Sequence, residues 1–89
     1  MTKEEATEKA RKDLAKRLDL DESQVKEQTV SDVDFPDMAL GAGGAGEMSG
    51  QMITPGWKIQ LKANGKSYEY RADKNQLRLY KFKGKNYKV

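Results

Sequence analysis

The first twenty residues carry apolar side chains at a helical spacing. Thr2 and Glu5 stand in the spacing of a capping box, in which each side chain accepts a hydrogen bond from the other residue's backbone N–H. An apolar residue then recurs at every fourth position: Ala6, Ala10, Leu14 and Leu18. The pattern predicts a helix of about sixteen residues whose apolar stripe packs on a sheet. The polar segment 19–23 ends it.

A β-hairpin is predicted around Asn64-Gly65, the preferred two-residue type I′ turn. This turn fixes the register, and three pairs then share one face: Trp57 with Ala72, Ile59 with Tyr70, and Leu61 with Tyr68. The opposite face pairs Lys58 with Arg71, Gln60 with Glu69 and Lys62 with Ser67. One face of the hairpin therefore belongs to the core and the other to water.

Two further strands are predicted after a turn at residues 73–76. Leu77 opposite Ala72 and Leu79 opposite Tyr70 extend the apolar face, so Arg78, Tyr80 and Phe82 point to the other face. A tight turn at Gly84-Lys85 would pair Phe82 with Tyr87 and Tyr80 with Val89. We therefore expect a second aromatic cluster on the outer face.

The segment between helix and hairpin predicts one strand and one long loop. Residues 25–35 are rich in β-branched side chains, and the alternation slips between Val30 and Val33, as at a bulge or an edge strand. Residues 36–54 have no period and carry five glycines, which makes the loop flexible unless it docks. Together the elements predict a single domain, residues 1–89, of the α+β class: one N-terminal helix on a four- to five-stranded antiparallel sheet, in two layers.

Composition narrows the chemistry. The chain of 89 residues has no Cys and no His, which removes thiol nucleophiles, imidazole bases and the usual zinc and haem ligands. It also has no G-x-S-x-G nucleophile elbow. We therefore expect a protein that is not an enzyme and needs no cofactor.

Charge is distributed unevenly along the chain. Residues 1–55 hold 7 Lys/Arg against 12 Asp/Glu, and residues 56–89 hold 10 against 2, so the net charges are −5 and +8. No apolar run is long enough to span a membrane, and the charged start is unlike a signal peptide. The chain as given is expected to be soluble, and it is either cytoplasmic or the mature part of an exported or lipid-anchored precursor.

Several short motifs occur in a characteristic order. They are Phe35-Pro36-Asp37-x-x-Leu40-Gly41, the glycine-rich loop, Pro55-Gly56 before a strand, and Tyr68-x-Tyr70 in the hairpin. In this order, over about residues 6–73, the chain resembles a family of small uncharacterised prokaryotic domains with a cystatin/PepSY-like fold, many of them exported or lipid-anchored. The resemblance implies no catalytic residue. Family members often carry Cys where Ala42 stands, and the cystatin inhibitor signature is matched poorly by residues 51–55.

Two motifs match ligand-binding patterns, one for a nucleotide and one for Ca²⁺, but each lacks the surrounding residues that such a site needs. Residues 41–46 match G-x-G-x-x-G, but no βαβ unit surrounds them, so a mobile or docked loop is expected rather than a nucleotide site. Asp32, Asp34 and Asp37 could offer oxygen ligands to Ca²⁺, but the glycine and closing glutamate of an EF-hand are missing. An Asx turn at Asp37 before the loop is the preferred interpretation.

Two sets of residues point to binding. The leading hypothesis is a module for a protein or peptide partner, whose contacts are Met38, Leu40, Met48, Met52, Tyr80, Phe82 and Tyr87. The methionines near the glycines could instead close the open end of the sheet. The alternative hypothesis is nucleic-acid binding through four lysines interleaved with the aromatic residues: Lys81, Lys83, Lys85 and Lys88.

Overall fold

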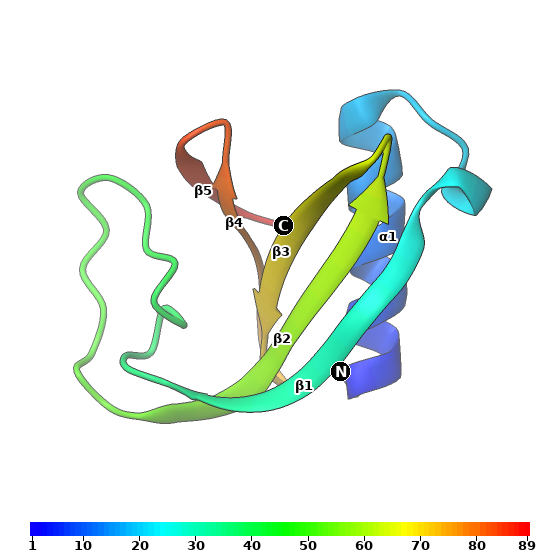
Figure 1. Cartoon of the computed structure of the whole chain (residues 1–89). Helices are drawn as coiled ribbons and strands as arrows, with labels where there is room; N and C mark the ends of the chain where they lie inside the picture. Colours follow the sequence, from blue (N-terminus) through cyan, green and yellow to red (C-terminus); the bar gives the residue numbers. More distant parts are fainter.

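The computed structural model describes residues 1–89 as one α-helix and a five-stranded antiparallel sheet, with a short 3₁₀ helix between them. The elements are α1 (Lys3–Leu18), η1 (Glu22–Gln24), β1 (Lys26–Phe35), β2 (Thr54–Ala63), β3 (Lys66–Ala72), β4 (Leu77–Phe82) and β5 (Lys85–Lys88). The strands follow each other in the order β1-β2-β3-β4-β5. Figure 1 shows α1 on one side of the sheet and the loop between β1 and β2 on the other. The predicted two-layer α+β class is confirmed.

The N-terminus of α1 is closed by the predicted capping box. The Thr2 hydroxyl accepts the Glu5 backbone N–H at 3.1 Å, and the Glu5 carboxylate accepts the Thr2 backbone N–H at 2.8 Å. The second bond lowers the pKa of the Glu5 carboxyl. The helix ends at Asp19, which takes a left-handed φ of 56°.

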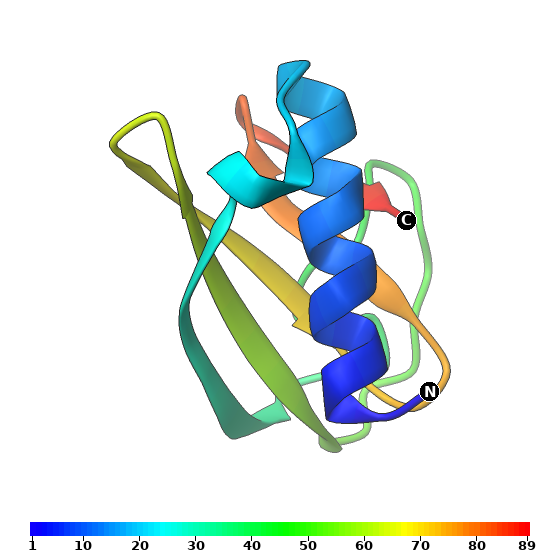
Figure 2. The same cartoon turned by 90° about the vertical axis from the view of Figure 1, so that its right-hand side faces the viewer.

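The helix lies across one face of the sheet (Figure 2). The main core is formed by side chains of both. Its predicted members from the sheet, Ile59, Leu61, Tyr70, Leu77 and Leu79, are all buried there, and Trp57 and Tyr68 pack at its margin. The small side chains of Ala6 and Ala10 are fully buried, so the helix lies close to the strands. The Tyr70 hydroxyl donates to the Asp13 carboxylate on α1 at 2.7 Å. Burial, together with this bond, raises the pKa of Tyr70.

The hairpin register is confirmed: all six predicted pairs are present, and the ladder also joins Ala63 with Lys66. Asn64 and Gly65 have φ of 53° and 75°, as a type I′ turn requires. The predicted pairs Ala72–Leu77 and Tyr70–Leu79 are also present. The turn at Asn64-Gly65 thus sets the register of β2 and β3, and the turn at residues 73–76 sets that of β4.

The irregularity in β1 lies elsewhere than predicted. The ladder between β1 and β2 shifts between Glu27 and Thr29 and is regular from Val30 to Val33. Val30 pairs with Ile59 on the helix side, and Val33 pairs with Gly56 on the other side. Both faces of this strand are partly covered, so the two valines do not need to share one. The predicted edge position is confirmed, because β1 is the first strand of the sheet.

The predicted outer aromatic cluster is wrong. Lys81 takes a left-handed φ of 49°, and the β4–β5 ladder shifts between Leu79 and Phe82, so Phe82 turns back into the helix-side core. The turn lies at Lys83-Gly84 instead of Gly84-Lys85. Tyr87 consequently pairs with Leu79, and its ring meets Phe82 edge-on at 6.1 Å.

The only α-helix of the structure is neither long nor apolar enough to cross a lipid bilayer.

Candidate functional site

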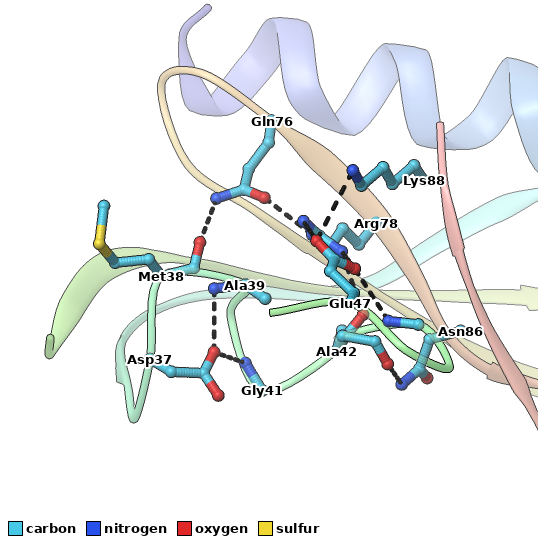
Figure 3. Close-up of polar contacts among 12 residues, drawn as sticks. Asp37, Met38, Ala39, Gly41, Ala42, Glu47, Gln76, Arg78, Asn86 and Lys88 are labelled. Atoms are coloured by element: carbon cyan, nitrogen blue, oxygen red, sulfur yellow. Dashed lines mark hydrogen bonds and ion pairs between the residues drawn. The ribbon is translucent and has the colours of Figure 1, made fainter. Parts of the chain in front are cut away.

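The loop of residues 36–53 is docked on the outer face of the sheet. Four side chains of the sheet and its turns donate hydrogen bonds to main-chain carbonyls of this loop. Figure 3 shows Gln76, Arg78 and Asn86 beside the loop. Arg71 reaches Leu40 at 3.0 Å, and Gln76 reaches Met38 at 2.7 Å. Arg78 reaches Ala42 at 3.4 Å, and Asn86 reaches Gly43 at 2.9 Å. The glycine-rich segment therefore follows one path that the sheet fixes.

A partly buried ion pair closes this arrangement, with Arg78 buried and Glu47 partly exposed. The guanidinium of Arg78 donates to both carboxylate oxygens of Glu47 at 2.7 Å, and the backbone N–H of Gly44 donates to the same carboxylate at 2.9 Å. The Arg78 hydrogen bonds lower the pKa of Glu47 from 4.5 to about 2. The carboxylate of Glu47 thus accepts the hydrogen bonds that Arg78 and the Gly44 backbone N–H could otherwise donate to a bound anion.

The loop also brings a second, smaller core to the outer face. Phe35, Ala39, Leu40 and Ala42 are buried there, apart from the helix-side core. Arg71 lies over the Tyr80 ring at 3.6 Å and the Phe35 ring at 5.4 Å. Leu40, a predicted partner contact, therefore has no exposed side chain to offer.

The three aspartates of the candidate calcium site do not converge on one point. Asp37 accepts the backbone N–H groups of Ala39 and Gly41 at 2.9 Å, which is the predicted Asx turn. Asp32 pairs with Lys3 of the helix at 3.1 Å. No three acidic residues of the structure are placed to hold one metal ion.

A groove of about 670 Å³ opens at the base of the loop, where β1 ends and β2 begins. Its apolar lining comprises Val33, Met38, Met52, Ile53 and Trp57. Met38, Met52 and Ile53 are 50%, 64% and 68% exposed, while Trp57 is half-buried against the core. Asp32 and Asp34 line the same groove. We call it the Met-Trp groove.

The C-terminal residues are not arranged as one binding face. Tyr80 lies beneath Arg71, Phe82 is buried, and the Tyr87 ring is covered by Arg17 at 4.7 Å. Lys88 approaches Glu47 at 3.6 Å. Lys81, Lys83 and Lys85 are exposed. Of the predicted partner contacts, Met38 and Met52 thus lie in one groove. The aromatic residues Tyr80, Phe82 and Tyr87 lie outside it.

One protein family matches most of this chain: the family described as "Domain of unknown function (DUF8738)" matches residues 7–80. The chain belongs to this family. No curated protein and no solved structure matches the chain at a significant level.

Within this DUF8738 chain, the loop anchors are the residues that sequence reasoning missed. Glu47 is the only charged residue between Met38 and Ile53, which was a usable signal. A lone charge in a glycine-rich loop needs either water or a partner, and β4 supplies Arg78 on the outer face. The sequence pattern placed Trp57 in the core and did not predict that it also lines the groove.

Proposed function

We propose that the protein is a non-enzymatic module that binds an extended peptide segment of a protein partner in the Met-Trp groove and along the edge of β1. The exposed apolar lining of Met38, Met52 and Ile53 carries this proposal. Large apolar side chains that gather at the surface of a small domain are typical of a contact surface. Unbranched thioethers can adapt to the shape of a partner.

The adjoining strand offers main-chain hydrogen bonds. β1 has a neighbour on one side only, and its bulge lies between Glu27 and Thr29, away from the groove. The stretch 29–35 is regular and leads into the groove lining. An added strand can pair with this edge while its side chains enter the groove.

Charge favours a basic partner segment. Asp32 and Asp34 line the groove together with one lysine, Lys74. Asp32 is paired with Lys3, whereas Asp34 takes part in no ion pair of the structure. Asp73, also in the lining, is occupied by the backbone N–H groups of Asn75 and Gln76. A segment that alternates apolar and basic side chains fits both features.

A peptide titration tests the proposal. The peptide Lys-Ile-Lys-Val-Lys-Ile-Lys, blocked at both ends, is compared with the same peptide carrying Glu in place of Lys, and Trp57, the only tryptophan, reports binding by its fluorescence. We expect Met52→Ser and Ile53→Ser each to weaken binding roughly tenfold, because each removes apolar contact area. Amide protons of residues 29–35 should gain protection from hydrogen exchange in the complex.

Met48→Ser is the matched control, since Met48 is 96% exposed on the same loop but outside the groove lining. Equal weakening by this variant, or equal binding of the acidic peptide, would contradict the proposal. Deleting residues 41–50 is a poorer test because it also removes Ala42 and Glu47, which hold the loop to the sheet.

The cystatin/PepSY-like resemblance remains part of this proposal. It is supported by the arrangement of one helix across an antiparallel sheet, with strands consecutive along the chain. Inhibition of cysteine proteases is not proposed, since residues 51–55 match the inhibitor signature poorly.

Nucleic-acid binding is the second candidate, favoured by the exposed Lys81, Lys83 and Lys85. It is the weaker one, because Tyr80, Phe82 and Tyr87 do not present free ring faces for base stacking. It predicts retention on a single-stranded DNA column that falls steeply with salt and is lost in Lys81→Glu/Lys83→Glu. Absence of retention at low salt excludes it.

A further inference from the structure

The sheet is open between β3 and β4 at the end that lies beside Leu18 of α1. The β3–β4 ladder runs from Ala72–Leu77 only to Glu69–Tyr80, although β3 begins at Lys66 and β4 continues to Phe82. The left-handed Lys81 coincides with the point where the strands part. A cleft of about 430 Å³ occupies this gap. It lies at the opposite end of β3 from the Met-Trp groove.

The cleft has an apolar floor. Leu18 and Tyr68 are half-buried, Phe82 is buried at 9% exposure, and all three line the cleft. The rings of Tyr68 and Phe82 are tilted against each other with centroids 6.0 Å apart. These side chains offer a surface that an apolar body of suitable size can cover.

The rim of the cleft is basic. Lys66, Lys81 and Lys83 line it and are exposed. The Lys83 ammonium lies 5.4 Å from the centroid of the Phe82 ring, and the Lys81 ammonium lies 5.6 Å from that of Tyr80. The only carboxylate in the lining, Glu69, is paired with Arg71 at 2.7 Å. The three ammonium groups are therefore not neutralised within the cleft.

We propose that this basic cleft binds a small organic anion with an apolar, aromatic body. The body covers Leu18, Tyr68 and Phe82, and the anionic group lies between the lysine ammonium groups. A volume of about 430 Å³ lies in the range of small-ligand sites. This site is independent of the peptide groove, because the two share no lining residue.

A dye titration followed by NMR tests this site. Anilinonaphthalene sulfonate has the required anion and aromatic body, and phenylnaphthylamine keeps the rings without the sulfonate. We expect the sulfonate dye to shift the amide signals of Leu18, Tyr68 and Phe82. The neutral dye should bind about fivefold more weakly or worse.

Lys81→Gln/Lys83→Gln should lower the affinity for the sulfonate dye about fivefold or more. The matched control is Lys58→Gln/Lys62→Gln on β2, which removes the same charge outside the cleft and should leave binding unchanged. Far-UV circular dichroism verifies that both variants are folded. Shifts confined to the Met-Trp groove, equal binding of the neutral dye, or equal losses in the two double variants would each overturn the proposal.

Discussion

Gly56 allows β2 to pass close to Phe35 and to the backbone of β3, and replacing it should be costly. A Cβ atom at this position would lie 2.3 Å from the carbonyl oxygen of Ala72 and 3.1 Å from Cε2 of Phe35. Carbon and oxygen in contact prefer about 3.3 Å or more, so the strands would have to separate by roughly 1 Å. Ala72 is buried and paired with Trp57, which prevents an easy shift.

The expected loss can be set against the total stability. Overpacking costs about 1–3 kcal/mol. Because the clashing atom belongs to the backbone of a paired strand and cannot move aside easily, Gly56→Ala should cost about 3 kcal/mol. A chain of 89 residues has a free energy of unfolding of about 4–13 kcal/mol, so the loss is a large fraction of it. The melting temperature should fall by about 12–24 °C.

Urea unfolding followed by far-UV circular dichroism measures this loss. Gly43→Ala is the matched control, because its Cβ would meet nothing closer than 3.8 Å and the backbone is not left-handed there. That variant should stay within about 0.5 kcal/mol of wild type. If Gly56→Ala unfolds at the same urea concentration as wild type, the close approach of the strands is refuted.

Three further predictions concern single side chains. Because the pKa of Glu47 is depressed to about 2, the unfolded state binds more protons than the folded state between pH 4.5 and about 2, and the stability from this group, present above pH 4.5, falls across this interval. In Glu47→Gln, the urea midpoint should therefore depend less steeply on pH in this range. An unchanged dependence would contradict the pairing with Arg78. Phe82→Ala should lose about 3–5 kcal/mol in urea unfolding, because the ring lies in the core; a loss under about 0.5 kcal/mol would return it to the outer face. Because burial raises the pKa of Tyr70, this tyrosine should not ionise below about pH 11. In a titration up to that pH, Tyr70→Phe and wild type should therefore gain the same tyrosinate absorbance. A smaller gain in the variant would show that Tyr70 ionises in this range.

Sequence reasoning succeeded where structure is local. The capping box and the Asn64-Gly65 turn each involve residues within a few positions, and they placed α1, β2, β3 and the start of β4 correctly. The single left-handed residue Lys81 was not predictable, because its backbone N–H is held by the Asn86 side chain at 2.8 Å, a contact that forms only after β5 folds back. This single residue places the Phe82 side chain in the helix-side core instead of on the outer face.

The candidate site was less accessible to prediction. The docking of the loop depends on Arg71, Gln76, Arg78 and Asn86, which are distant in sequence and carry no shared pattern. Each of them donates to a main-chain carbonyl, which every residue type has. Apart from Glu47, which pairs with Arg78, nothing in the loop sequence marks these contacts. The Met-Trp groove results from that docking, and its composition could only be read once the loop path was known.

Anchoring through carbonyl groups separates the course of the loop from the identity of its exposed side chains. Positions 48, 49, 51 and 52 contribute no side chain to the anchors, so substitutions there should alter surface chemistry while the backbone keeps its route. A library randomised at these positions should yield mostly folded members. The sheet then acts as a constant frame that displays a changeable segment.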